Sequence, residues 1–223
     1  VFMSNGEKCA EANYKHLMTC TSHLSNKKIW VSDIEGRVKS ARAAAEASRT
    51  DWFFAINAKL RVDKNFDWNW QPDRLQKPKH YIFYAYNPLT DDTYGHMAAI
   101  AWNKNLINTD TAYGLDLTMS HLHEVVPILS GEAVYGPSEW DLWRTAFREV
   151  IKLLASNDKD ADMHLIKWFE STDEWTVNGA EDAKNFYVRE AKGDLSKLKL
   201  TFDWEWLAKY FYLKYTDWAR PLK

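Results

Sequence analysis

The chain has 223 residues and a formal net charge of -2, with 46% hydrophobic and 27% charged residues. This is ordinary composition for one compact globular domain, so it excludes long disorder, collagen-like repeats and a solenoid. A chain without excess positive charge is not suited to stable nucleic-acid binding, and no apolar run approaches the roughly 20 residues that cross a bilayer.

The cysteines and the start of the chain indicate where the protein resides. Cys9 and Cys20 are the only cysteines and have no histidine spacing typical of zinc, so we expect free thiols in a reducing compartment. No basic and then apolar leader opens the sequence. We therefore expect a soluble cytoplasmic protein without membrane partners. Because residues 1–3 already resemble the middle of a strand, we also expect further residues before Val1.

The first 60 residues alternate between strand and helix patterns. An apolar run ends in the polar turn Ser-Asn-Gly-Glu at 4–7, and small and apolar residues then follow at helical spacing. This alternation is typical of parallel strands joined by right-handed crossovers. The predicted strands are 1–3, 29–31 and 52–56, and the predicted helices are 10–18 and 40–48.

The middle of the chain continues the strand pattern after an irregular segment. Residues 66–78 are aromatic, polar and proline-containing, which predicts a long loop. Strands are predicted at 81–86 and 96–102, and the turn residues between them indicate a hairpin, which we expect near the edge of the sheet. A further short strand is predicted at 125–129, ending at Ser130 and Gly131.

The last third is predicted to be helical. Ser138 and Asp141 form a capping pattern before a helix whose apolar stripe runs to Leu154. Further helices are predicted at 165–169, at 180–190 after an Asn178 cap, and at 204–215. We expect a single domain over 1–223, with a nucleotide-binding half at 1–60, an acceptor-side half at 61–155 and a helical portion at 156–223.

Several segments carry a family resemblance. Residues 36–45 and 50–59 resemble the donor half of family 2 glycosyltransferases, in which a small-residue helix precedes a hydrophobic strand that ends in Asp-x-Asp. Closer resemblances to glycosyltransferase-like proteins of phages and marine viruses lie at 70–74, 78–83, 94–97 and 143–149. The resemblance implies an α/β fold of the Rossmann-like nucleotide-diphospho-sugar transferase (GT-A) type, with a mostly parallel central sheet. For a viral protein it also implies the host cytoplasm.

The resemblance implies a donor site at the carboxyl ends of the first strands. Ser4 and Glu7 would lie there, with Glu7 on the base or ribose and Arg42 facing the diphosphate. Ligands of open α/β sheets bind at this edge, although residues 4–7 also suit an ordinary turn and helix cap.

The sequence departs from the family where Asp-x-Asp would bind Mg²⁺ or Mn²⁺. Asn57 and Lys59 stand there instead, and they supply neither the charge nor the ligands that such an ion requires, so a metal cofactor is not expected. Lys59 can itself neutralise a leaving diphosphate. The alternatives are an exposed residue at the end of a strand, or a fold that has lost catalysis.

Acceptor activation requires a carboxylate or an imidazole. We select His96, Asp116 and His123 as candidates. His96 follows a glycine at the start of a predicted strand, and Asp116 and His123 flank a segment expected to lead to the sheet edge. Asp141 lies where related transferases carry their base, but helix capping explains it without chemistry.

The acceptor pocket is expected to take residues from the long loop and from one helix. Trp70, Asp73 and Arg74 lie in the loop, where they can form a wall of the pocket or cover the core. Arg144 can bind a phosphate or carboxylate, or pair with neighbouring acidic residues on its own helix.

The function expected from the sequence is transfer of a sugar from a nucleotide diphosphate sugar to a hydroxyl acceptor. Two alternatives belong to other classes. One is a non-catalytic module that binds sugar or nucleotide on the same fold without the metal site. The other is a structural or interaction domain of a virus particle, which would bind no nucleotide.

Overall fold

The computed structural model describes residues 1–34, 36–108, 122–156 and 160–215. Within it the chain divides into two compact units, Val1–Val134 and Tyr135–Lys223. The first unit contains the sheet and the second contains helices. The sequence interpretation placed 1–223 in one domain with an internal division at 155, whereas the division between the units falls at 134.

The first unit is built on a seven-stranded sheet in the order β2-β1-β3-β6-β5-β7-β4. Its strands are β1 (Phe2–Met3), β2 (Trp30–Val31), β3 (Trp52–Asn57), β4 (Leu60–Val62), β5 (His80–Asn87), β6 (Asp92–Asn103) and β7 (His123–Ala133).

The sheet is mixed. β1 pairs in parallel with β2 and β3, and β5 pairs in parallel with β7. β6 is antiparallel to both of its neighbours, β3 and β5, and β4 is antiparallel to β7. Five of the seven strands therefore run in one direction. The predicted α/β class is confirmed, as is the β5–β6 hairpin, but this hairpin lies inside the sheet, so its predicted place near the edge is wrong.

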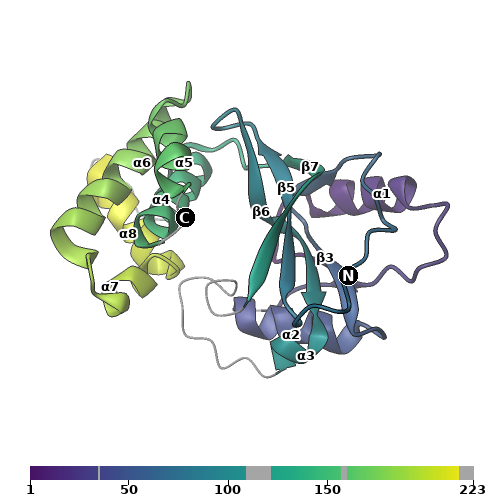
Figure 1. Cartoon of the computed structure of the whole chain (residues 1–223). Coiled ribbons are helices and arrows are strands. Elements are labelled where there is room, and N and C mark those ends of the chain that lie inside the picture. The colour runs from purple at the N-terminus through teal and green to yellow at the C-terminus, as the bar shows by residue number, and fades with distance from the viewer. Residues whose placement is uncertain (35, 109–121, 157–159, 216–223) are drawn as a thin grey trace. The chain divides into compact units, whose positions relative to one another are not determined.

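Helices cover both faces of the parallel part of the sheet. α1 (Ala10–Cys20) contributes Ala10 and Leu17 to the core on one face, together with Ile56 of β3. On the other face, α2 (Arg37–Ala47) packs its buried alanines against Phe53 and Ala55. Figure 1 shows α2 beside the short helix α3 (Lys104–Asn108), which contacts it. Because successive side chains of β3 point to opposite faces and helices cover both faces, the strand is apolar from Trp52 to Ile56.

The sheet departs from the sequence prediction at β4 and β7. β4 was not predicted, because three residues between two turns carry no periodic signal. β7 continues through Ser130 and Gly131 to Ala133, so its predicted end is wrong. Gly131 lets it continue, because a Cβ atom there would lie 2.2 Å from the Arg61 carbonyl oxygen of β4.

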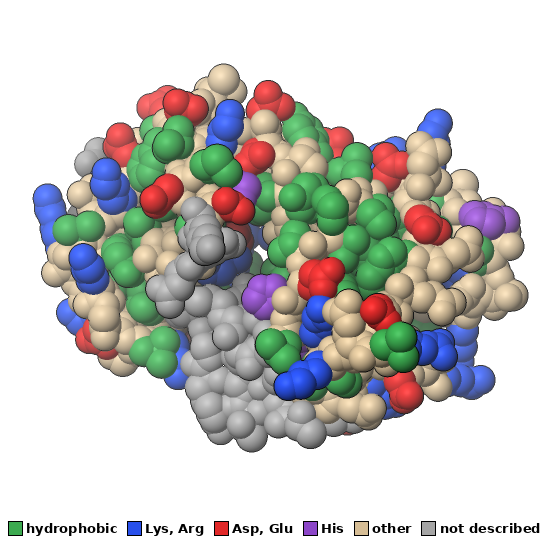
Figure 2. Space-filling model, viewed as in Figure 1, with side chains coloured by type: hydrophobic (Ala, Val, Ile, Leu, Met, Phe, Trp, Pro, Cys, Tyr) green, Lys and Arg blue, Asp and Glu red, His purple; other side chains and the backbone are tan. Residues whose placement is uncertain are grey.

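One exposed apolar surface lies on β7 and the residue before it. Leu122, Val125 and Leu129 are exposed, while Val126 is buried in the core. Figure 2 shows hydrophobic side chains gathered over the strands of the first unit. The alternation along β7 is that of a strand with one face in the core.

The second unit is helical, as predicted. Its elements are α4 (Glu139–Ala155), α5 (Ala161–Phe169), α6 (Glu174–Phe186), the π-helix η2 (Tyr187–Ala191), α7 (Leu195–Leu200) and α8 (Trp204–Tyr215). Ser138 caps α4 as predicted. The predicted Asn178 cap is wrong, because α6 begins four residues earlier and Asp173 caps it through the backbone N–H of Thr176.

A buried carboxylate joins three helices of this unit. Asp182 of α6 is 2% exposed and accepts hydrogen bonds from the Trp143 indole of α4 at 2.9 Å and the Tyr215 hydroxyl of α8 at 2.7 Å. Lys214 forms an ion pair with the same carboxylate. Burial, and then the hydrogen bond to Asp182, raise the pKa of Tyr215 above its ordinary value. A buried charge with this many donors fixes the register of the helices.

Candidate functional site

The candidate site lies at the carboxyl ends of β1 and β3. From β1 the chain crosses to β2 on one side and then returns to β3 on the other, so strand order reverses between β1 and β3. Such a reversal in an open α/β sheet forms a ligand crevice beyond the carboxyl ends of the strands. Met3 pairs with Asn57, and the Ala58 N–H donates to the Met3 carbonyl at 2.8 Å. The turns at 4–7 and 57–59 therefore lie side by side, as the sequence predicted.

The 4–7 turn is organised by its own polar side chains. Gly6 has φ 83°, a left-handed conformation that favours glycine. The Glu7 carboxylate accepts a hydrogen bond from the Asn5 N–H at 2.6 Å, and the buried Ser4 hydroxyl accepts one from the Trp30 indole at 2.7 Å. The turn that the sequence selected for donor binding is thus held in one conformation before any ligand arrives.

The 57–59 turn is held from two sides. The Asn57 side-chain oxygen accepts a hydrogen bond from the Lys59 N–H at 2.9 Å. The carbonyl of the fully buried Ala58 accepts one from the Asn13 side chain of α1 at 2.7 Å, and the Cys9 thiol lies 3.5 Å from the same oxygen. The Asn57 side chain thus forms an Asx turn, in which a side-chain oxygen accepts a hydrogen bond from the backbone N–H two residues further on.

Lys59 places a positive charge beside this crevice. Its side chain is half-buried, and its ammonium group opposes the rise in the Cys9 pKa, which burial of the thiol causes. The Glu7 carboxylate acts on the same thiol in the opposite direction. Lys59 and Glu7 therefore both lie within electrostatic reach of Cys9, and the crevice carries one charge of each sign.

An aromatic cluster that the sequence interpretation did not select lies next to the 4–7 turn. Trp30 of β2 is 37% exposed, and its ring lies 4.6 Å from that of Tyr14 and 5.2 Å from that of Phe2, between ring centroids. A partly exposed ring beside a crevice can stack on a planar ligand. In the sequence, Trp30 is visible only as a tryptophan in the second predicted strand. Its place beside the 4–7 turn follows from the pairing of β2 with β1, which the sequence does not show.

His96 lies at the same edge of the sheet. β6 pairs Ala99 with Ile56, and its earlier residues extend past the end of β3. Between its pairs with β5, β6 advances five residues from Gly95 to Ile100 while β5 advances two, which forms a bulge at residues 96–99. Bulges often redirect a side chain beside a functional site.

The imidazole of His96 stabilises this bulge. Its Nδ1 accepts a hydrogen bond from the Ala98 N–H at 3.2 Å, and its ring lies 5.8 Å from the Tyr94 ring. A neutral imidazole whose Nδ1 accepts carries its proton on Nε2. In this arrangement the Nε2–H of His96 is a hydrogen-bond donor. The sequence predicted that His96 acts as a general base, which would require the tautomer that carries its proton on Nδ1.

The other predicted acceptor-side bases do not join His96 in the described structure. His123 is the first residue of β7 and pairs with His80, the first residue of β5. Both lie at the amino ends of strands that run parallel to β3, so His123 lies at the edge opposite the crevice and is not part of the candidate site. Asp116 lies outside the described residues.

Arg42 belongs to α2, and Trp70 belongs to the segment between β4 and β5. Arg42 is exposed on α2. Trp70 packs against Tyr81 and Phe83, with ring centroids 4.8 and 5.1 Å apart, so its ring covers the core, as the alternative interpretation held.

Asp73 and Arg74 are both exposed in the same loop. Asp73 shapes a local turn by accepting hydrogen bonds from the Leu75 N–H at 2.9 Å and from the Gln76 side chain at 3.1 Å. Its carboxylate is therefore engaged in holding the loop.

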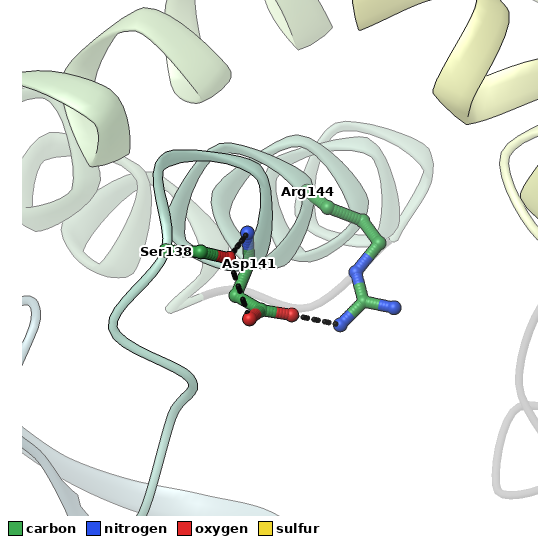
Figure 3. A network of polar contacts seen from close by, with 3 residues as sticks. All are labelled: Ser138, Asp141 and Arg144. Atoms are coloured by element: carbon green, nitrogen blue, oxygen red, sulfur yellow. Dashed lines mark hydrogen bonds and ion pairs between the residues drawn. The ribbon is translucent and has the colours of Figure 1, made fainter. Parts of the chain in front are cut away.

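Arg144 belongs to α4 in the second unit. Figure 3 shows it beside Asp141, which lies between Arg144 and the capping Ser138. The Arg144–Asp141 pair spans 3.2 Å, the Ser138 hydroxyl donates to Asp141 at 2.6 Å, and the guanidinium lies 3.9 Å from the centre of the Trp204 ring. Pairing with a neighbouring acidic residue was the alternative predicted for Arg144, and the structure contains that pair. The Arg144 side chain is 6% exposed, so the pair is not the surface pair that was expected.

The described residues contain no group of three or more His, Cys, Asp or Glu placed to hold a metal ion. Of the helices in the described ranges, none has the length and apolar character to cross a membrane. The 4–7 and 57–59 turns together carry a cation, a carboxylate and a neighbouring aromatic ring. Comparison of the chain with protein-family models, with curated proteins and with solved structures gives no match.

Proposed function

We propose that the protein is a glycosyltransferase of the nucleotide-diphospho-sugar (GT-A) type, and that the crevice between the 4–7 and 57–59 turns binds the donor. The observation that carries the proposal is the register of Met3 with Asn57, which brings the two turns together at the carboxyl ends of parallel strands. This is where phosphate-bearing ligands bind in open α/β sheets.

In the proposed reaction an acceptor hydroxyl attacks the anomeric carbon of the donor sugar. The bond between that carbon and the diphosphate oxygen breaks, the nucleotide diphosphate leaves, and the hydroxyl proton passes to a base. The developing negative charge on the diphosphate is the largest electrostatic change, and a fixed cation beside it lowers the barrier. Lys59 has this role in the proposal, with His96 donating a hydrogen bond from Nε2.

The aromatic cluster supports binding of the nucleoside. Trp30 is oriented by its hydrogen bond to Ser4, so the exposed part of its ring is fixed next to the 4–7 turn. A preorganised ring loses little conformational freedom when a base stacks on it. Glu7, predicted to bind the base or ribose, holds the turn in the absence of ligand and would keep one carboxylate oxygen for that contact.

A non-catalytic module that binds nucleotide or sugar is the second candidate. The observation that favours it is the pair Asn57 and Lys59 at the place of the family's metal-binding acidic residues, where the Asn57 side chain is committed to the turn. The two candidates share the same crevice and differ only in turnover.

The test is a thermal-shift screen of the whole chain with the diphosphates of uridine, guanosine and cytidine, each with and without Mn²⁺. We expect at least one nucleotide to raise the Tm without Mn²⁺, because a ligand that binds only the folded state stabilises it. Lys59→Met should weaken its binding about tenfold, since a charge-assisted contact contributes about 1.5 kcal/mol. Lys77→Met, at an exposed loop position, is the matched control.

The same preparation is then assayed for release of nucleotide diphosphate from several nucleotide sugars. Nucleotide binding with turnover supports the transferase. Binding without turnover under every condition selects the non-catalytic module. If no nucleotide changes the Tm, or if Lys77→Met weakens binding as much as Lys59→Met, the assignment of this crevice is wrong.

A further inference from the structure

A concave surface lies in the first unit beside β4, the strand that follows the 57–59 turn. It is an open groove of about 430 Å³ between α1, β4 and the carboxyl halves of β5 and β7. It is lined by His16, Arg61, Val62, Asp63, Lys64, Tyr86, Leu129, Gly131 and Glu132. None of the residues of the donor crevice lines it, so we call it the β4 groove.

The walls of the β4 groove are fixed by specific contacts. The His16 imidazole donates through Nε2 to the Val62 carbonyl at 2.8 Å, which ties α1 to β4. Gly131 lets β4 approach β7, since its missing Cβ would collide with the Arg61 carbonyl. Tyr86 is held by its hydroxyl, which donates to Asp91 at 3.0 Å. These contacts hold α1, β4, β7 and the Tyr86 side chain in place around the groove.

Four charged side chains that line the groove form no ion pair with another described residue, although the Asp63 carboxylate accepts a hydrogen bond from the Asn65 N–H at 2.7 Å. Arg61 and Glu132 are directly opposite each other on β4 and β7, where side chains of opposite charge normally meet. Yet no ion pair within 4.0 Å joins Arg61, Asp63, Lys64 or Glu132 to any residue of the described ranges. Both signs of charge are thus presented to the solvent in the groove.

The presence of both signs of charge restricts which ligands can bind in the groove. An anion would be attracted by Arg61 and Lys64 but repelled by Asp63 and Glu132. A cation would be attracted by the two carboxylates and repelled by the two basic groups. A hydroxyl group both donates and accepts, so a polyhydroxylated ligand can bond with guanidinium, ammonium and carboxylate groups in the same groove. The Tyr86 ring and the exposed Leu129 supply apolar surface for the C–H face of a sugar ring.

We propose that the β4 groove is a carbohydrate-binding site, separate from the donor crevice and independent of whether the protein transfers sugar. Arg61 and Glu132 bind ring hydroxyls from opposite strands, and Tyr86 stacks on the sugar. A site of this kind would hold a glycan on the first unit, whether that glycan is acceptor, product or anchor.

The test begins with a glycan array probed with the whole chain, followed by ¹H–¹⁵N NMR titration with maltotriose, chitotriose and any glycan that the array identifies. We expect amide shifts at β4 and the carboxyl half of β7. Arg61→Ala and Glu132→Ala should each weaken binding at least tenfold. Both side chains are exposed, so the variants should keep the wild-type Tm, which is measured alongside.

Two controls separate this proposal from the donor crevice. Lys59→Met should leave glycan binding unchanged, whereas loss of glycan binding in that variant would move the site to the crevice. Inorganic phosphate should not compete with the glycan. The proposal is overturned if no glycan binds, if Arg61→Ala and Glu132→Ala bind as the wild type does, or if phosphate displaces the glycan.

Discussion

Single residues decide the local geometry at the 4–7 and 57–59 turns and at the β4 groove. Gly6 allows the left-handed turn beside β1, and Asn57 closes the turn after β3. Gly131 has φ 154° and lies where β7 and β4 come closest. The two glycines act by lacking a side chain, whereas Asn57 acts through its side-chain oxygen, which accepts the hydrogen bond from the Lys59 N–H.

Gly131→Ala should lower the free energy of unfolding by about 3 kcal/mol, because the added Cβ meets a backbone carbonyl that cannot move away without breaking the β4–β7 ladder. Chemical denaturation measures this change. The matched control is Gly6→Ala, where φ is also positive but nothing lies within 4 Å of an added Cβ, so the free energy of unfolding should fall by only about 1 kcal/mol, the cost of the left-handed conformation. Equal effects of the two variants would contradict the role given to Gly131.

At the scale of elements, capping residues set where the helices begin, and a bulge sets the course of β6. The sequence pattern predicts these positions only approximately. Asp173 caps α6, Ser138 caps α4, and Asp194 caps α7 by accepting hydrogen bonds from the Ser196 and Lys197 N–H groups. Within β6, the bulge at 96–99 turns the strand where it passes the end of β3.

Asp194 provides a pH-dependent test of the capping. Hydrogen bonds from the Ser196 hydroxyl, and then from the backbone, lower the pKa of Asp194 below its ordinary 3.8. The ionised cap therefore stabilises α7 at pH values above the ordinary pKa, and this contribution is lost as the pH falls through the lowered pKa. NMR titration of the Asp194 carboxyl should show the lowered pKa.

Substitutions at Ser196 complete that test. Ser196→Ala should return the Asp194 pKa toward 3.8, because the hydroxyl donor is the largest cause of the shift. Ser196→Thr retains the hydroxyl and should leave the pKa low. A pKa of 3.8 or above in the wild type, or no difference between the two variants, would show that the cap is not formed as described.

At the scale of the whole molecule, the chain is two compact units with separate interiors. The sheet unit has a core on each face of β3, and the helical unit is organised around aromatic packing and the buried Asp182. A substitution that disrupts the interior of one unit should therefore destabilise that unit before it affects the other.

Asp182→Ala should destabilise the helical unit by about 3 kcal/mol, because it leaves the Trp143 and Tyr215 donors and the Lys214 charge without their common acceptor. Hydrogen–deuterium exchange should increase in α4, α6 and α8 while β3 and β6 keep their protection. Asp182→Asn, which retains an acceptor, should have a smaller effect. A uniform rise in exchange across the sheet strands would show that the two units unfold as one.

The sequence by itself determined the alternation of strands and helices through β3, the β5–β6 hairpin, the Ser138 cap and the meeting of the 4–7 and 57–59 turns. These follow from local periodicity and from the rule that parallel strands share an edge for their carboxyl ends.

Only the tertiary structure decided the position of β6 between β3 and β5, the short strand β4, the bulge that holds His96, and the separation of His123 from the crevice. Each depends on which distant segments pair, and pairing is set by contacts between residues far apart in the sequence. The β4 groove belongs to this second group, because Arg61 and Glu132 are 71 positions apart in the chain and meet only through the β4–β7 register.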